Sequence, residues 1–244
     1  MKYLICSDIH SNLPALIKFK EIIDKYFNNG YTLICLGDII GYGAFPSECI
    51  KIVKEMNFMI ISGNHERMLL NPEMRSYASE AARIAIEWTE SMINNEEKSF
   101  IEKLNPMINL DNKILLVHGS PIDPDAYILS SQIAIENIKY LNQLQIKLCF
   151  FGHSHYPGIF DQNGMFYYSL ENDFILDKQE YYLINPGSIG QPRDGDSRGS
   201  FCLFDSDEML LRFYRFVYDI DSAYEKIKEN KLPLELGLRL YYGK

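Results

Sequence analysis

Short apolar runs, each followed by a small residue or a carboxylate and then by a side chain of a metal-binding type, recur five times along the chain. They occupy residues 4–10, 33–38, 59–65, 114–119 and 148–155. Runs of Ile, Leu, Val and Phe without polar alternation are typical of strands buried on both faces. The glycines that follow several runs allow the chain to turn sharply after the strand. The pattern therefore predicts five buried strands.

Segments with helical periodicity separate these runs. They span residues 12–28, 46–56, 76–94, 95–104 and 130–144. Ser11 or Asn12 is placed to cap the first helix, with Pro14 in its first turn, and Ser130 or Ser131 to cap the last. Alternating strands and helices predict a layered α/β fold with the helices outside.

The pattern changes from Tyr156 onward, in a hairpin-rich second half of about residues 156–218. Short strands are expected at residues 158–161, 165–169, 181–185, 200–205 and 209–218. Turn signals such as Asn163-Gly164 join them, which predicts hairpins that complete a second sheet. A C-terminal helix is expected at about residues 222–230. No linker or low-complexity segment interrupts the chain, so we expect a single domain over residues 1–244.

All the histidines of the chain lie where the predicted strands end. They are His10, His65, His118, His153 and His155, and Asp8, Asp38 and Asn64 accompany them in the same motifs. Active sites of open α/β sheets lie beyond the carboxyl ends of the strands. A lone histidine is more often structural than a ligand, but five of five at strand ends favour a metal site.

The five motifs together resemble one family. Asp8-Ile9-His10, Gly37-Asp38, Gly63-Asn64-His65-Glu66, His118-Gly119 and Gly152-His153-Ser154-His155 are similar, in order, to the signature of the calcineurin-like metallophosphoesterase superfamily. The resemblance covers most of residues 4–155. It implies the family fold, a four-layer α/β/β/α sandwich of mixed sheets flanked by helices.

The resemblance also implies a dinuclear metal centre. One ion would be bound by Asp8, His10 and His155, the other by Asn64, His118 and His153, and Asp38 would bridge the two. This oxygen and nitrogen ligand set suits two divalent ions, with manganese expected first and iron, nickel or zinc as alternatives. A bridging carboxylate offsets the repulsion between cations ~3.5–4 Å apart.

The implied reaction is phosphoester hydrolysis. A hydroxide bridging the two ions would attack phosphorus in line while the ions stabilise the phosphoryl oxygens. His65 is left over from the ligand set, and the family places it facing the phosphate. It is expected to bind a phosphoryl oxygen or to protonate the leaving oxygen, tasks suited to a pKa near about 6.5. The alternative is a structural histidine beside ligand Asn64.

One motif departs from the serine/threonine protein phosphatases of the superfamily. Their Gly-Asp motif continues to an Asp-Arg pair that orients the catalytic histidine and holds the phosphate. Here Gly41 and Tyr42 occupy those places, although Glu66 fits the protein-phosphatase form of the third motif. The departure favours the small prokaryotic branch, whose members are phosphodiesterase-like or metallophosphatases.

Residues 185–193 also resemble that prokaryotic branch. The backbone N–H groups of this Gly- and Pro-rich turn are suited to an anion nest, and Arg193 to a bidentate phosphate contact. A tight turn with an exposed arginine is the alternative. Tyr42 is either a lining residue of the substrate cleft or an ordinary loop aromatic. The helical insertion at about residues 71–104, with Trp88, either covers one side of the site or packs on the sandwich.

Composition narrows the substrate. The net charge is −9, which argues against long nucleic acid as a partner but allows a small-molecule or nucleotide phosphoester, since bound cations reverse the local field. The five cysteines lie in no CxxC pair and are expected as reduced core residues. No apolar run reaches ~20 residues and no signal-peptide pattern follows Met1, so we expect a cytoplasmic protein with no membrane partner.

The leading hypothesis is therefore a metal-dependent hydrolase of phosphomonoesters or phosphodiesters. A protein phosphatase is the second enzyme hypothesis and is disfavoured by Gly41 and Tyr42. A nuclease is disfavoured by the acidic charge. A non-catalytic scaffold of the same fold is expected to lose ligands or the catalytic histidine, and this chain keeps all of them.

Overall fold

Two six-stranded mixed sheets form the centre of the molecule. The computed structural model describes residues 1–27, 30–168 and 173–244. The first sheet has the order β3 (Met59–Ile60), β2 (Tyr31–Cys35), β1 (Lys2–Cys6), β11 (Gly199–Asp205), β12 (Leu210–Phe216) and β9 (Phe174–Ile175). The second has the order β4 (Met107–Leu110), β5 (Ile114–Val117), β6 (Leu148–Phe150), β10 (Tyr182–Asn185), β7 (Gly158–Phe160) and β8 (Phe166–Tyr167).

Each sheet has a parallel part and an antiparallel part. Strands β1, β2 and β3 run parallel, and β11, β12 and β9 continue that sheet antiparallel. In the second sheet β5, β6 and β10 are parallel, while β4, β7 and β8 run antiparallel to their neighbours. All five predicted strand motifs thus lie on parallel strands.

Alternating side chains of the strands fill different layers, because successive residues of a strand point to opposite faces. In β1, Tyr3 and Ile5 enter the core between the sheets, whereas Leu4 and Cys6 pack outward. The second sheet behaves likewise, with its outward residues in a separate core beneath α6 (Ser131–Leu144). This explains why the runs are apolar throughout.

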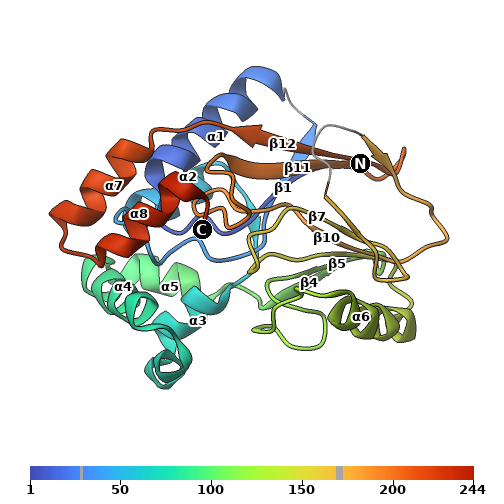
Figure 1. Cartoon of the computed structure of the whole chain (residues 1–244), viewed down its shortest axis with the longest axis horizontal. Helices are drawn as coiled ribbons and strands as arrows, with labels where there is room; N and C mark the ends of the chain where they lie inside the picture. The colour runs from blue at the N-terminus through green and yellow to red at the C-terminus, as the bar shows by residue number, and fades with distance from the viewer. Residues whose placement is uncertain (28–29, 169–172) are drawn as a thin grey trace.

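Helices cover both outer faces and complete the four layers. Helices α1 (Leu13–Tyr26) and α2 (Pro46–Glu55) pack on the first sheet and α6 on the second, so Figure 1 shows helix, sheet, sheet and helix in succession. The predicted α/β/β/α fold is confirmed. Asn12 and Ser130 cap α1 and α6, as their side chains accept from the backbone N–H of Ala15 and Ile133.

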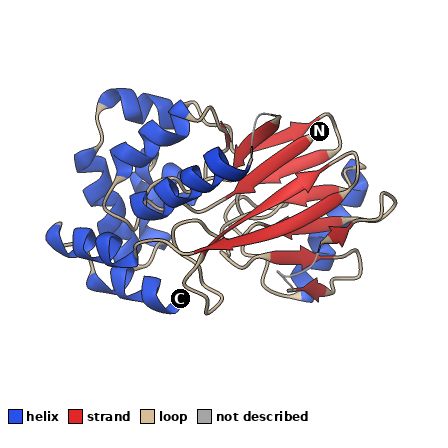
Figure 2. Ribbon diagram, turned by 90° about the horizontal axis from the view of Figure 1, so that it is seen from above, coloured by secondary structure: helices blue, strands red, loops and turns tan. Residues whose placement is uncertain are grey.

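The remaining helices gather at one end of the sheets (Figure 2). They are α3 (Asn64–Leu70), the 3₁₀ helix η1 (Pro72–Tyr77), α4 (Glu80–Met92), α5 (Asn95–Glu102), α7 (Ile220–Glu229) and α8 (Leu234–Tyr242). The N-terminus lies at the opposite end, where β1 begins. The carboxyl ends of the parallel strands therefore point toward these helices.

Several boundaries differ from the expected ones. The helix expected at residues 76–94 is divided, because Ser79 has an extended backbone. Its side chain accepts the backbone N–H of Ala82 and so caps the start of α4. The C-terminal helix begins at Ile220, after the cap Asp219. Helices α3 and α8 and strands β4 and β9 were not predicted. Residue 28 of the first expected helix and residue 169 of an expected strand lie outside the described residues.

The expectation that the hairpins of the second half complete the second sheet is only partly right. Strands β7, β8 and β10 do, but β11 pairs with β1 in the first sheet, and β12 follows it. The reason is burial on both faces: Phe201 and Leu203 of β11 enter the outer core, and Cys202 and Phe204 enter the core between the sheets.

Two smaller expectations concern cysteines and membranes. All five cysteines are free and buried, as predicted. Among the residues that the structure describes, no helix is both long enough and apolar enough to cross a bilayer.

Candidate metal centre

The strand ends bring the predicted ligands into one buried cluster. Three groups of side chains have donor atoms within 4.8 Å of one another. They are Asp8, His10 and His155; His10, Asp38 and His65; and Asp38, His118 and His153. His10 and Asp38 each belong to two groups, so the cluster is continuous.

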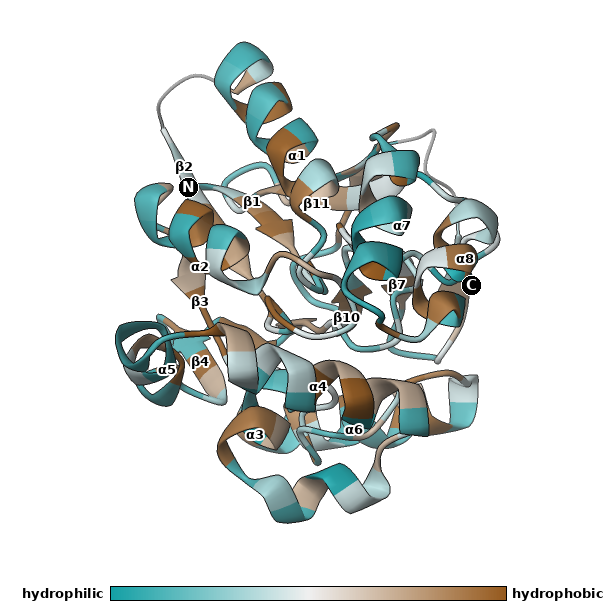
Figure 3. Cartoon of the chain, turned by 90° about the vertical axis from the view of Figure 1, so that its left-hand side faces the viewer, coloured by the Kyte–Doolittle hydropathy of each residue, from teal (hydrophilic) through white to brown (hydrophobic). Residues whose placement is uncertain are grey.

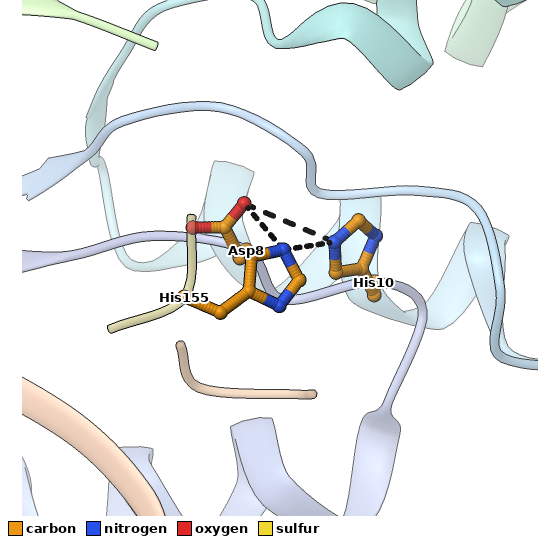
Figure 4. Close-up of side chains that lie close together, drawn as sticks. All are labelled: Asp8, His10 and His155. Atoms are coloured by element: carbon orange, nitrogen blue, oxygen red, sulfur yellow. Dashed lines mark hydrogen bonds and ion pairs between the residues drawn. The ribbon is translucent and has the colours of Figure 1, made fainter. Parts of the chain in front are cut away.

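The first group joins strand ends from both sheets. Asp8 and His10 follow β1, and His155 follows β6 of the other sheet. The Nε2 atom of His155 lies 3.2 Å from Asp8 Oδ1 and 3.2 Å from Nε2 of His10, and the three side chains face a common point (Figure 4). His10 Nε2 also lies 3.7 Å from Asp38 Oδ2, which links this group to the next.

The group of Asp38, His118 and His153 forms around Asp38, which follows β2. Asp38 Oδ2 lies 3.2 Å from Nε2 of His118, which follows β5. The same His118 nitrogen lies 2.9 Å from Oδ1 of Asn64, the first residue of α3. Asp38 therefore lies between the two groups, the position expected of a shared ligand.

Each of four histidines uses one ring nitrogen to contact a backbone carbonyl. Nδ1 contacts the oxygens of Ile40 (His10, 3.3 Å), Leu36 (His118, 2.7 Å) and Gln191 (His155, 2.5 Å), and Nε2 of His153 contacts that of Asp125 (3.1 Å). A carbonyl can only accept, so these nitrogens carry the proton. In the neutral form of each ring, the opposite nitrogen presents its lone pair to the cluster, which is the tautomer a metal ligand requires.

The donor set fits divalent cations. The neutral Nε2 atoms of His10 and His155 turn lone pairs toward each other beside the Asp8 carboxylate. Acceptors brought together without a donor repel one another unless a cation or a proton lies among them. Imidazole, carboxylate and amide oxygens are ligands of first-row divalent metals. The cluster is therefore a buried metal-binding site.

The backbone at the cluster is strained. Five non-glycine residues have left-handed φ angles of 51° to 63°. They are Asp8, His10, Asp38, His153 and His155. Such residues cost about 1–2 kcal/mol each and persist where surrounding structure holds them. The sharp turns after the strands thus aim both side chains of the Asp-x-His and His-x-His motifs into the cluster.

Glu66 holds the second and third motifs together, a role not inferred from the sequence. Its carboxylate is fully buried and accepts the backbone N–H of Asp38, Ile39, Ile40 and Gly63 at 2.7 to 3.2 Å. Burial and then the charge of Asp38 raise the pKa of Glu66 to about 7, although the hydrogen bonds from backbone N–H groups act to lower it. Glu66 therefore joins the Asp38 loop to the start of α3 through these four hydrogen bonds.

Charges within the cluster shift the pKa values in opposite directions. Burial opposes ionisation of Asp38, but His118 and His65 outweigh it and hold the pKa of Asp38 well below its usual range. Burial likewise lowers the pKa of His118, but the charge of Asp38 and its hydrogen bond raise it to about 9. Asp38 is thus ionised in this geometry.

His65 differs from the other histidines. It is buried, its Nδ1 has no hydrogen-bond partner within the described residues, and its Nε2 lies 3.9 Å from Asp38 Oδ2. Burial lowers its pKa to about 4, despite the opposing charge of Asp38. Within the described residues, His65 is the one cluster imidazole with no hydrogen bond to a backbone carbonyl.

Gly41 lies directly against the His65 ring. It has φ +86°, and a Cβ there would lie 2.0 Å from Nδ1 of His65. The Tyr42 ring packs edge-on to His65, with 4.4 Å between the ring centroids. With His65 in this position, no side chain fits at residue 41, so the carboxylate of an Asp–His pair is excluded there.

Four backbone N–H groups of residues 185–193 already have protein partners and are therefore not available for an anion nest. Ile189 and Gly190 donate to the carbonyls of Ser7 and Asp8, Gly187 to Asn185 Oδ1, and Gln191 to Ser188 Oγ. The turn instead supports the Asp8 loop and supplies the carbonyl that orients His155.

Arg193 lies beside the site and is not an exposed turn residue. Its guanidinium donates to Oε1 of Gln191 (3.0 Å) and to the Tyr42 hydroxyl (3.3 Å). No carboxylate forms an ion pair with it in the part of the chain that the structure describes. Burial is the main cause of the lowered pKa of His155, and the charge of Arg193 lowers it further. Burial is also the main cause of the lowered pKa of His65, to which His118 and then Arg193 add.

The loop between β5 and α6 was not recognised from the sequence as part of the site. The ring of Tyr127 stacks on His153, with 3.8 Å between centroids and 18° between planes. Arg67 of α3 holds the loop through the Pro124 carbonyl and an ion pair with Asp125. The position of this loop depends on these tertiary contacts.

Comparisons with known proteins agree with these motifs. A family model, the calcineurin-like phosphoesterase superfamily domain, matches residues 1–209. The Methanocaldococcus jannaschii protein MJ0912 is 38% identical over 245 residues, covering 98% of this chain and 97% of that protein. The Escherichia coli phosphodiesterase YfcE is 22% identical over 225 residues, covering 86% and 91%.

A solved structure extends the similarity over the whole chain. The metallophosphoesterase from Sphaerobacter thermophilus is 31% identical, covers 100% of both chains and superimposes with a TM-score of 0.86. Its agreement includes the helices after residue 209, which the family model does not reach. The chain therefore belongs to the calcineurin-like phosphoesterase superfamily.

Proposed function

We propose that this chain hydrolyses phosphomonoester or phosphodiester bonds of a small-molecule or nucleotide substrate with two divalent metal ions. The observation that carries the proposal is the pair of donor groups that meet at Asp38, with ring nitrogens fixed to face inward. Family membership and the similarity to a phosphodiesterase support the reaction class.

The ligand assignment follows the two groups. Asp8, His10 and His155 would hold one ion, Asn64, His118 and His153 the other, and Asp38 both. When bound, two such ions supply Lewis-acid stabilisation of phosphoryl oxygens and an acidified water as nucleophile. Manganese is the first choice, with iron, nickel and zinc as alternatives.

The protein's own side chains orient the phosphate. Arg193 carries a positive charge without a carboxylate partner among the described residues, and its guanidinium is suited to bidentate contact with phosphoryl oxygens. His65 would donate an imidazole N–H to a phosphoryl oxygen or to the leaving oxygen. Tyr42, which contacts both Arg193 and the His65 ring, keeps these two groups in place.

Glu66 is proposed as a positioning residue. It contacts no donor atom of the cluster's metal groups directly but fixes the backbone of Asp38 and of Gly63, next to Asn64. Asp38 and Asn64 would therefore move if the hydrogen bonds of Glu66 were lost.

The geometry favours a small phosphoester over a phosphoprotein. The protein phosphatases need a carboxylate beside the catalytic histidine, and Gly41 leaves no room for one. We expect Mn²⁺-loaded protein to hydrolyse bis-p-nitrophenyl phosphate or p-nitrophenyl phosphate at least tenfold faster than a phosphopeptide. Chelation should abolish turnover and added Mn²⁺ should restore it. Absence of turnover of every ester would refute the proposal, and preference for the peptide would favour a protein phosphatase.

Substitution of the shared ligand tests the two-ion arrangement. Asp38→Asn keeps the size of the side chain but removes its charge, so the content of both ions should fall together. Metal analysis after dialysis measures this directly, and Asp24→Asn, at an exposed position on α1, is the control. Unchanged metal content, or loss of one ion alone, would contradict the bridging role of Asp38.

Removal of the unanchored imidazole tests the role of His65. His65→Ala should retain both metal ions but lose turnover by at least about 10²-fold, the usual contribution of a positioned acid or hydrogen-bond donor. Metal content and kcat are measured on the same sample, so loss of ions is separated from loss of chemistry. Turnover close to that of the unmodified protein would show that His65 is structural.

The positioning role of Glu66 is tested by Glu66→Gln. The amide N–H₂ group cannot accept, so at least one of the bonds from Asp38, Ile39, Ile40 and Gly63 is lost, with two donors facing one another in the interior. We expect a loss of about 2–4 kcal/mol in the free energy of unfolding by urea, and weaker Mn²⁺ binding. Glu55→Gln, exposed on α2, should change neither. Equal Mn²⁺ affinity in a folded Glu66→Gln variant would limit Glu66 to stability alone.

A further inference from the structure

A cleft of about 380 Å³ opens directly from the metal centre. Asn64, His65 and His153 line it at the cluster, and residues of α3, η1, α4 and the β5–α6 loop line the rest. It belongs to the size range of small-ligand pockets, about 300–1,000 Å³. A phosphoryl group bound at the cluster would fill only its inner end, so the cleft accommodates a larger part of the substrate.

Apolar side chains contribute much of the lining away from the cluster. They are Met68 of α3, Met74 of η1, Ala78 before α4 and Ala82 within it, with Ser79 between the two alanines. Figure 3 shows strongly hydrophobic segments on α3 and α4, which lie beside each other below the sheets in that view. Asp125 is the single carboxylate among the lining residues, and Arg67 pairs with it. Away from the cluster, the lining therefore suits an uncharged group.

Besides Tyr42, two tyrosines from separate elements line this cleft. Tyr77, in the last turn of η1, is 92% exposed, and Tyr127, in the β5–α6 loop, is 42% exposed. The Tyr127 ring is already held flat against His153, which places one aromatic plane at a fixed orientation next to the cluster. Flexible methionines and preoriented aromatic faces are the side chains that bind planar rings by stacking.

We propose that this cleft binds a planar ring of the substrate, and we commit to a nucleobase, so that the substrate is a nucleoside phosphoester. The inference rests on the proposed phosphoesterase function and specifies its substrate class. The phosphate lies at the cluster, and the base lies in the apolar part of the cleft against Tyr127 and beneath Tyr77. Stacking on an aromatic side chain is sequence-tolerant, so purine and pyrimidine esters are both expected to bind.

The test compares esters that differ only in the base. Adenosine 5′-monophosphate is compared with ribose 5-phosphate, and the p-nitrophenyl ester of thymidine 5′-phosphate with the p-nitrophenyl ester of 1,2-dideoxyribose 5-phosphate, on Mn²⁺-loaded protein. The member with the base should have a kcat/KM at least about tenfold higher, in line with typical stacking on one aromatic ring. Tyr127→Leu and Tyr77→Ser should each reduce this ratio by at least threefold. Tyr26→Ser, which replaces an exposed tyrosine at the end of α1, should leave it unchanged.

A second measurement is independent of turnover. Adenosine, which has no phosphate, should give saturation-transfer NMR signals with the unmodified protein and with Tyr26→Ser, and weaker signals with Tyr127→Leu. Equal kcat/KM within each pair of esters would overturn the nucleobase assignment while leaving the phosphoesterase proposal intact. Absence of turnover of all four esters, with no adenosine signal, would overturn both. A preference for the base that the tyrosine variants retain would place the base elsewhere and also overturn this assignment.

Discussion

The site depends on one buried carboxylate. Asp38 lies within 3.9 Å of ring nitrogens from three histidines and also accepts the backbone N–H of His65. Burying this charge is costly unless opposite charge compensates it. Neutral imidazoles whose lone pairs face inward supply no such charge. The arrangement is therefore one that cations complete, and the carboxylate at its centre explains why the two donor groups lie so close together.

The two sheets supply the rigidity that this arrangement needs. Asp8 and Asp38 follow neighbouring parallel strands of the first sheet, whereas His118 and His155 follow neighbouring parallel strands of the second. Packing of the sheets on a shared core brings these ends together. The left-handed backbone at Asp8, Asp38 and the histidines is costly locally, but the strands before them are buried on both faces and do not yield. Hydrogen bonds to the Glu66 carboxylate then hold the backbone of the Asp38 loop, and the turn at residues 185–193 holds the backbone of the Asp8 loop.

The sequence predicted the parts of the site that depend on local pattern. Buried strands followed by a ligand-type residue are visible as apolar runs, and the topology of parallel strands requires their ends to meet, so the metal-ligand candidates could be identified. The parts that depend on which groups partner one another could not. The N–H groups of residues 187–191 appear free in the sequence, yet the Ser7 and Asp8 carbonyls take two of them. Glu66 resembles any glutamate at a helix start until its four N–H partners are known. The placement of β11 beside β1 is likewise a long-range pairing that no local pattern specifies.

The contacts of Gly41 connect the reaction class with the choice of substrate. Because residue 41 has no Cβ, the His65 ring lies directly against the 41–43 turn, where Tyr42 packs on it and accepts from Arg193. The imidazole is thus held by packing instead of by a carboxylate, and the positive charge beside the cluster comes from a different loop than the Asp-Arg pair of the protein phosphatases would use. The same turn borders the cleft that Tyr127 and Tyr77 line, so the residues that replace the phosphatase pair also shape the space beyond the phosphate. In the described part of the chain, residue 41 leaves no room for a carboxylate beside His65, whereas Tyr127 and Tyr77 present aromatic surface next to the cluster.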